Sequence, residues 1–144
     1  MTAPKGRILA IDYGSRRVGL AMTDPLQVLA SGAGTIENDG GVVAEVARRV
    51  GDDGVVLVLV GMPYAPDGGV GAKGTEILKF VEELRGVLEV PVETWDESFS
   101  STRAQQVFRE GGMKQKQRRE KGRIDEMAAR LFLQEYLETH DHRE

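Results

Sequence analysis

The first third of the chain alternates short apolar runs with breaks, which is the pattern of a strand meander. Residues 7–13 and 17–24 are apolar and β-compatible, and residues 14–16 between them are typical of a hairpin turn. A third extended segment, residues 27–36, follows the turn signal Asp24-Pro25. We therefore expect three consecutive strands, each antiparallel to the one before it.

The apolar period then changes from strand-like to helical. Apolar residues recur at three- and four-residue spacing from Val42 to Val50, and predict a helix that Asn38 or Asp39 caps. The next segment, Val55 to Val60, is apolar without interruption, as expected of a strand that helices cover on both faces. This pattern places that strand centrally in a sheet.

The second half of the chain continues this alternation of helix and strand. A Gly- and Pro-rich loop precedes an amphipathic helix, a strand then ends in an acidic pair, and two further helices flank a basic loop. In order, the predicted segments are the loop 61–74, the helix 77–88, the strand 91–95, the helix 98–109 and the helix 122–138.

The order of these elements predicts the α/β class. We expect a mixed five-stranded sheet, an antiparallel three-strand meander joined to parallel strands, with helices on both faces. Because crossovers between parallel strands are right-handed, strand 55–60 should lie parallel to the first strand, beside it or its neighbour. A length of 144 residues suits one hydrophobic core, so we expect a single domain, 1–144, with a flexible tail from about 139.

Composition narrows the class of protein. The chain has no cysteine, which excludes disulfides, thiolate zinc sites and cysteine nucleophiles, and which fits a reducing compartment. Its longest apolar run is too short to span a bilayer, and the basic N-terminus leads into a core strand rather than a signal-type segment. We therefore expect a cytoplasmic protein without a membrane partner.

Two acidic residues stand at the carboxyl ends of predicted strands. Asp12 shares its strand face with the apolar Ile8 and Ala10, and Glu97 lies just past the strand 91–95, in the pair Asp96-Glu97. Sites in open α/β sheets gather at such strand ends, so these acids are expected to share one crevice. Taken singly, Asp12 has a simpler explanation as a turn residue, and Glu97 as a helix cap.

A third acid, Asp125, lies on the stripe of the last helix that should face the sheet. A charge on such a stripe costs on the order of several kcal/mol unless a partner neutralises it. The alternative is a carboxylate that complements the helix dipole. The apolar residues of the stripe are Ala128, Ala129, Phe132 and Tyr136, and the polar residues expected on the opposite, solvent face are Glu126, Arg130 and Gln134.

Gathered carboxylates repel one another, and a hard divalent cation with oxygen ligands relieves the repulsion. Asp12, Glu97 and Asp125 are therefore the candidate catalytic and metal-ligating residues, with Mg²⁺ or Mn²⁺ as the cofactor. Metal ions held in this way activate water against a phosphate group. Phosphodiester hydrolysis is the expected chemistry.

Positive charge is concentrated just before Asp125, although the formal net charge is −4. A basic segment at that place is a candidate clamp for a nucleic-acid backbone, and a solvated loop is the alternative. Two arginines at the turn of the first predicted hairpin are further candidates for contact with phosphate. The candidate nucleic-acid contacts are Arg16, Arg17, Lys114, Lys116, Arg118, Arg119, Lys121 and Arg123.

Four blocks of the chain, in the family's order, resemble the YqgF family, also called RuvX, of Holliday-junction resolvases and pre-ribosomal-RNA nucleases. The blocks are IDYGSRRVGLAMTD (11–24), LVGMPYAPDGG (59–69), WDESFSSTRA (95–104) and KGRIDEMAARLFLQEYL (121–137). The resemblance covers nearly the whole chain. It implies a ribonuclease-H-like fold and carries the family's acidic residues onto Asp12, Glu97 and Asp125.

One position departs from the commonest family pattern. Many members have Arg after the Asp-Glu pair, where this chain has Ser98. A phosphate contact made by that Arg in other members is therefore not available from Ser98. Arg103, further along the next predicted helix, is the candidate replacement.

The leading hypothesis is a Mg²⁺- or Mn²⁺-dependent nuclease, monomeric or homodimeric. Its substrate is structured RNA, such as the 5′ end of pre-16S rRNA in a ribosome precursor, or branched DNA such as a Holliday junction. A second hypothesis is a non-catalytic nucleic-acid- or ribosome-binding module. A third is a nucleotide-binding ATPase-like domain, suggested by the first hairpin, although such enzymes need two domains and this chain has room for one.

Overall fold

Three antiparallel strands begin the chain and form one half of a sheet, as predicted. The computed structural model describes residues 5–64, 68–97 and 121–140, and only the backbone of 121–125. The three strands are β1 (Arg7–Tyr13), β2 (Arg17–Thr23) and β3 (Ala30–Glu37), which pair in that order.

Alternating helices and strands complete the sheet. These elements are α1 (Val42–Asp53), β4 (Val55–Met62), α2 (Gly71–Val87), β5 (Val92–Asp96) and α5 (Lys121–Thr139). The strand order is β3-β2-β1-β4-β5, with β4 parallel to both β1 and β5. This order confirms the predicted mixed five-stranded sheet and the parallel placement of β4 beside the first strand.

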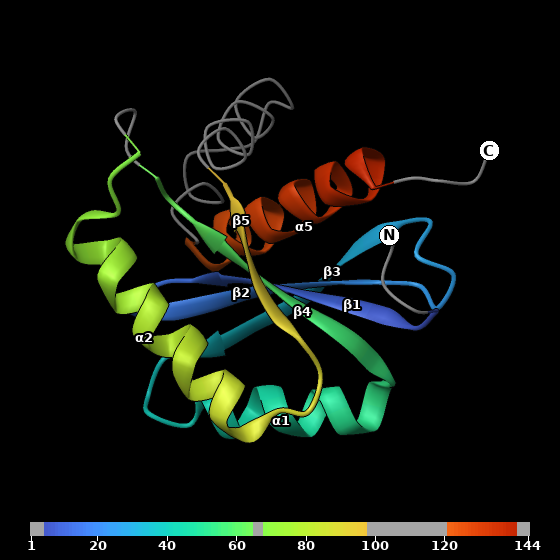
Figure 1. Cartoon of the computed structure of the whole chain (residues 1–144), viewed down its shortest axis with the longest axis horizontal. Coiled ribbons are helices and arrows are strands. Elements are labelled where there is room, and N and C mark those ends of the chain that lie inside the picture. The colour runs from blue at the N-terminus through green and yellow to red at the C-terminus, as the bar shows by residue number, and fades with distance from the viewer. Residues whose placement is uncertain (1–4, 65–67, 98–120, 141–144) are drawn as a thin grey trace.

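Helices cover both faces of the sheet, so two apolar layers form. Figure 1 shows α1 and α2 on one face and α5 on the other. Within β1, Leu9 and Ile11 belong to the layer under α1 and α2, whereas Ile8 and Ala10 belong to the layer under α5. Because side chains alternate along a strand, Asp12 falls on the α5 face.

The third strand begins later than predicted, because residues 24–29 form a hydrogen-bonded turn. Asp24 Oδ1 accepts the N–H groups of Val28 at 2.9 Å and Leu29 at 2.8 Å. Gln27 takes a φ of 60°, in the left-handed region. An aspartate that binds the backbone of following residues competes with extended structure, and β3 therefore starts at Ala30.

The predicted cap of the first helix is wrong. Gly41 is the N-cap of α1, and no side chain caps it. Asn38 Nδ2 instead donates to the Gly14 carbonyl oxygen at 2.8 Å, which ties the end of β3 to the first hairpin. Asp39 Oδ1 accepts the N–H of Gly41 at 3.1 Å, one position before the helix begins.

The loop within the Gly- and Pro-rich segment 61–74 is shorter than predicted. At one end β4 continues to Met62, and at the other α2 already begins at Gly71. Gly74 lies buried inside that helix, against Val70 and Met62. Its missing side chain therefore serves close packing rather than a flexible loop.

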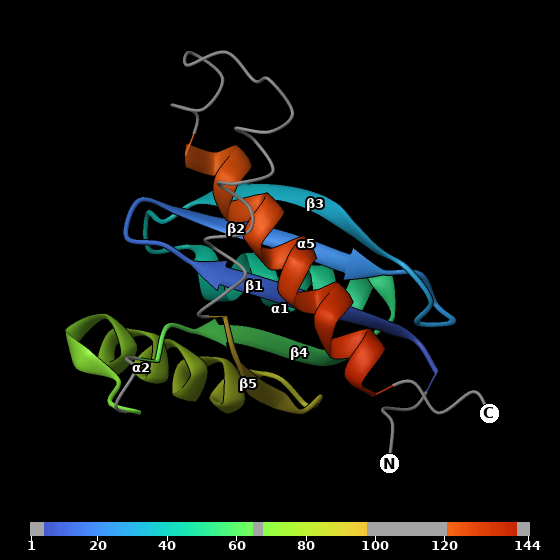
Figure 2. The same ribbon diagram turned by 90° about the horizontal axis from the view of Figure 1, so that it is seen from above.

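The predicted apolar stripe of α5 is confirmed, but its predicted solvent face is partly wrong. Ala128, Ala129 and Phe132 are fully buried. Glu126 and Gln134, however, accept backbone N–H groups of β3. Helix α5 crosses one face of the sheet diagonally (Figure 2), and these two partly buried side chains reach the backbone of the edge strand.

Two predicted segments, the helix 98–109 and the basic residues 114–120, lie outside the described residues. The predicted tail begins within helical structure, since α5 includes Thr139 and the ring of His140 stacks on that of Tyr136. Among the described helices, none combines the length and the apolar character needed to cross a bilayer.

Candidate active site

Asp12 lies near the carboxyl end of β1, between two glycines of the neighbouring strands. Gly19 is its partner on β2. On the other side, the register that pairs Ile11 with Val60 brings Asp12 beside Gly61, one step further along both strands. Asp12 is partly buried. Since neither flanking position carries a side chain, the space around this carboxylate is left to other groups.

Glu97 continues the pairing of β5 beyond the end of the strand. Its N–H donates to the Met62 carbonyl oxygen at 3.0 Å, which fixes the backbone beside the end of β4. The side chain is buried, with 7% exposed. Its position follows from Trp95, two residues earlier, which packs on the α5 face of the sheet.

The Glu97 carboxylate lies directly over Gly61. A Cβ built on Gly61 would stand 2.6 Å from Glu97 Oε2 and 2.9 Å from Glu97 Cδ. It would also stand 2.9 Å from Cε2 of Phe132, which reaches the same place from α5. Only glycine at position 61 leaves room for the acid.

The structure thus brings Asp12 and Glu97 together around Gly61. Neighbouring strands of a sheet are about 4.8 Å apart, and Gly61 lies beside Asp12 and beneath the Glu97 carboxylate. Both acids stand at the carboxyl ends of parallel strands and on the face that α5 covers. Gly61 was predicted to begin the loop 61–74 and not to be a site residue; in the structure it lies inside β4, where a glycine is a known sign of close approach by another group.

The third predicted acid, Asp125, belongs to the first turns of α5, and its side chain lies outside those described. Its backbone precedes Phe132 by two helical turns, about 10.5 Å along the helix axis. Phe132 in turn contacts the place above Gly61. The same helix therefore carries Asp125 and forms one wall of the site.

Asp12 and Glu97 offer the oxygen ligands that hard divalent cations prefer. Within the side chains that the structure describes, no group of three or more His, Cys, Asp or Glu residues is arranged to hold a metal ion. The two carboxylates fit one side of a coordination shell. Further ligands have to come from water, from the substrate or from a side chain outside the described set.

The candidate cations of the first turn differ in their surroundings. Arg16 is exposed, whereas Arg17 opens β2 and is partly buried. By strand alternation Arg17 shares the α5 face with Gly19 and Ala21, which is also the face of Asp12. Among the described residues, the buried Arg17 Nε atom has no hydrogen-bond acceptor. Since such a group is costly to bury, an anion is its natural ligand.

The remaining predicted cations divide into two sets. Lys121 and Arg123 belong to the helical backbone of α5, which begins one residue before the predicted helix 122–138. Their side chains are outside those described, as are the whole residues Arg103, Lys114, Lys116, Arg118 and Arg119.

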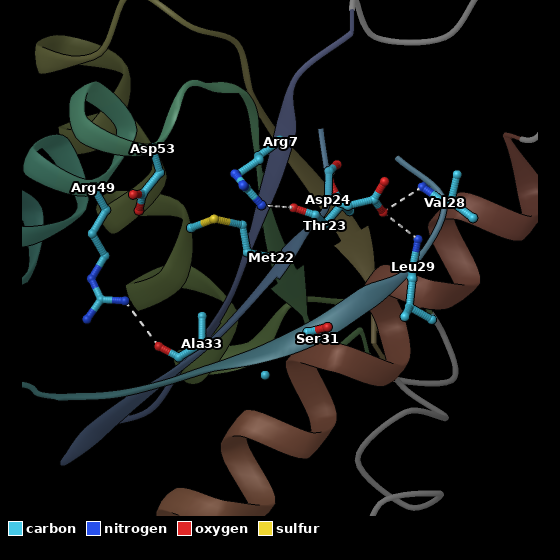
Figure 3. A pocket seen from close by; sticks show the side chains of 11 residues that line it. Arg7, Met22, Thr23, Asp24, Val28, Leu29, Ser31, Ala33, Arg49 and Asp53 are labelled. Carbon is cyan, nitrogen blue, oxygen red and sulfur yellow. Dashed lines mark hydrogen bonds between the residues drawn. The ribbon is translucent and has the colours of Figure 1, made fainter. Parts of the chain in front are cut away.

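A separate hollow of about 660 Å³ lies at the opposite end of β1 and contains none of the predicted site residues (Figure 3). Both arginines that line it form hydrogen bonds to the backbone. Arg7 Nη1 donates to the Thr23 carbonyl and Arg49 Nη1 donates to the Ala33 carbonyl, both at 3.1 Å. Arg7 is five residues, or roughly 17 Å, from Asp12 along the strand and points to the other face. The hollow is therefore not part of the acidic site.

Comparison with known proteins places the whole chain in one family. The family model described as "RuvX: Holliday junction resolvase" matches residues 6–139. A protein of Chlorobium luteolum named "Putative pre-16S rRNA nuclease" is 48% identical over 136 residues, which cover 94% of this chain and 96% of the relative. A protein of the same name from Chlorobaculum tepidum is 41% identical over 138 residues, covering 93% and 94%.

Solved structures share the fold at low sequence identity. Thermus thermophilus RuvC in complex with a Holliday junction substrate has a TM-score of 0.57 and 16% identity, with 93% of this chain and 94% of that chain covered. The Fowlpox virus resolvase with Holliday junction DNA has a TM-score of 0.58 and 14% identity, covering 94% and 99%. These matches confirm the predicted ribonuclease-H-like fold class.

Proposed function

The chain belongs to the RuvX family, and from this premise we propose that it is a divalent-metal-dependent nuclease that hydrolyses phosphodiester bonds. One observation carries the proposal: Asp12 and Glu97 approach one another around Gly61, at the carboxyl ends of parallel strands. A buried carboxylate beside a second acid favours a bound cation, since like charges otherwise repel.

Each proposed site residue has a distinct part. Mg²⁺ or Mn²⁺ bound at this place would lower the pKa of a coordinated water and stabilise the leaving oxygen. Asp12 and Glu97 would hold such a cation from the sheet, and Asp125 would supply a ligand from α5. Phe132 excludes water from the part of the site next to Gly61. Arg17, on the face of Asp12, binds a substrate phosphate.

Pre-16S rRNA is the substrate that the comparisons favour. The relatives with 48% and 41% identity are named for that substrate, whereas the structures with Holliday junctions share only 16% and 14% identity. An rRNA precursor also implies a cytoplasmic location. Branched DNA is the second candidate, because the fold is that of junction-bound resolvases.

Cleavage of a 5′-extended 16S rRNA precursor and of a four-way DNA junction, by one preparation, tests the proposal. We expect cleavage of the RNA with Mg²⁺ or Mn²⁺ and none in EDTA. The isosteric changes Asp12→Asn and Glu97→Gln should each lower the cleavage rate more than about 100-fold. Residues that only orient metal ligands typically change activity by about 10- to 100-fold, so a larger loss indicates a ligand.

Glu93→Gln is the matched control, because Glu93 is an exposed acid on β5, the strand that precedes Glu97. It should cleave like the wild type. Full activity of Asp12→Asn or Glu97→Gln, or cleavage in EDTA, would contradict the metal-dependent mechanism. Substrate binding without any cleavage would favour the non-catalytic module.

A further inference from the structure

Two polar side chains of α5 bind the backbone of the edge strand β3. The N–H of Gly34 donates to Glu126 Oε2 at 2.6 Å, and the N–H of Ala30 donates to Gln134 Oε1 at 3.1 Å. The two acceptors are about two helical turns apart along α5. Helix and edge strand are thus joined at two separate points.

The contact at Glu126 is the tighter of the two. A Cβ built on Gly32 would stand 2.8 Å from both Cδ and Oε2 of Glu126. The donor, Gly34, has a φ of 87°, in the left-handed region that favours glycine. Two glycines of β3 therefore let the Glu126 carboxylate lie directly against the strand backbone.

The beginning of α5 is intrinsically weak as a helix. No acidic residue lies in its first turn, which instead contains Lys121 and Arg123. Positive charge at a helix N-terminus opposes the helix dipole. Gly122, in the same turn, is a poor helix former. The stability of such a helix start depends on tertiary contacts.

Glu126 is the residue that directly follows Asp125, so its contact with β3 restrains the backbone at that position. We propose that Glu126 is a positioning residue that anchors the start of α5 to Gly34 and thereby holds Asp125 at the metal-binding end of the sheet. This inference rests on the proposed function, in which Asp125 is a metal ligand.

Three variants test the anchor. Glu126→Ala removes the acceptor, Glu126→Gln keeps an oxygen that the Gly34 N–H can reach, and Gln134→Ala removes the equivalent bond two turns away. Mn²⁺ affinity is measured by electron paramagnetic resonance without substrate, and hydrogen exchange is measured at the backbone amides of 121–126.

We expect Glu126→Ala to weaken Mn²⁺ binding about tenfold, within the range for residues that orient metal ligands, and to speed exchange at the start of α5. Glu126→Gln should restore both to within about twofold, since the amide oxygen accepts the same bond. Gln134→Ala should leave both unchanged. Equal Mn²⁺ affinities for Glu126→Ala and Gln134→Ala, or no rescue by Glu126→Gln, would overturn the proposal.

Asp12→Asn and Glu97→Gln, measured in the same way, separate this inference from the proposed function. If both bind Mn²⁺ like the wild type, the metal site itself is wrong. If both lose Mn²⁺ and Glu126→Ala does not, only the anchoring role of Glu126 is wrong. Loss in all three variants supports both.

Discussion

The carboxylate of Glu97 occupies the space that a side chain on Gly61 would fill, with Oε2 2.6 Å from the Cβ position. Phe132 closes the same space from α5 and is fully buried. A glycine near the carboxyl end of the buried strand β4 therefore determines where this acid lies relative to Asp12.

Gly61→Ala should remove most nuclease activity while leaving the protein folded. The added methyl group cannot displace the buried Phe132, so it pushes the Glu97 carboxylate away from the site, at a cost of about 1–3 kcal/mol from overpacking. Cleavage rates and urea unfolding midpoints measure the two effects.

The control for this variant is Gly86→Ala in α2, where no atom lies within 4 Å of the built Cβ. It should keep full activity and gain about 0.5–1 kcal/mol of stability, because alanine is the better helix former. A Gly61→Ala protein that cleaves as well as Gly86→Ala would show that the position of the Glu97 carboxylate does not matter.

The sheet could be predicted from the sequence because the apolar pattern of each strand indicates which of its faces are buried. The uninterrupted apolar run from Val55 to Val60 requires cover on both faces, and the structure places β4 between β1 and β5. The alternation of Ile8, Ala10 and Asp12 predicts that the acid shares a face with buried apolar residues. In the structure that face is the one under α5.

Contacts between elements could not be predicted in the same way. A helical periodicity assigns Glu126 and Gln134 to the side opposite the apolar stripe, but it contains no information on how far the helix lies from a sheet edge. Likewise, Gly61 is needed because Glu97 and Phe132, both distant in sequence, pack directly over it. Such residues become functional candidates only once the elements are packed together.

Arg17→Met should weaken nucleic-acid binding more than Arg16→Met does. Arg17, on the face of Asp12, has a buried Nε with no acceptor in the part of the chain that the structure describes, whereas Arg16 is exposed in the turn. If Arg17 binds a phosphate, its loss should reduce the slope of log affinity against log salt by about 1. Fluorescence anisotropy in the Asp12→Asn background separates binding from cleavage. Equal losses in the two variants would remove Arg17 as a specific phosphate contact.

Thr23→Val should destabilise the fold without affecting catalysis. The buried Thr23 hydroxyl accepts the N–H of Ile8 at 3.0 Å and donates to the Asp24 carbonyl at 2.8 Å. Valine has nearly the same shape, so the buried Ile8 amide loses its acceptor, at a cost of about 1–3 kcal/mol. Urea unfolding and hydrogen exchange at Ile8 measure this loss. An unchanged unfolding midpoint would contradict it.

Asp24 should contribute stability that depends on pH. The N–H of Leu29 is the main cause that lowers the pKa of the Asp24 carboxyl, against the opposing effect of burial and with further hydrogen bonds from Val28 and Leu26. A carboxyl whose pKa is lower in the folded state than in the unfolded state stabilises the fold above the unfolded pKa, near 3.9. The contribution is lost as the pH falls through the folded pKa.

Asp24→Ala should therefore cost about 1 kcal/mol at pH 7, as for loss of a side-chain cap, and the difference from the wild type should shrink below about pH 4. Urea unfolding at pH 7, 5 and 3 measures the difference. Asp24→Asn, which keeps an acceptor oxygen but does not titrate, should also lie closer to the wild type at pH 3 than at pH 7, because protonation neutralises Asp24 in the wild type too. A constant difference between wild type and Asp24→Ala from pH 7 to pH 3 would show that the Asp24 side chain supports the turn equally well when it is protonated, which contradicts a stabilising role of its ionisation.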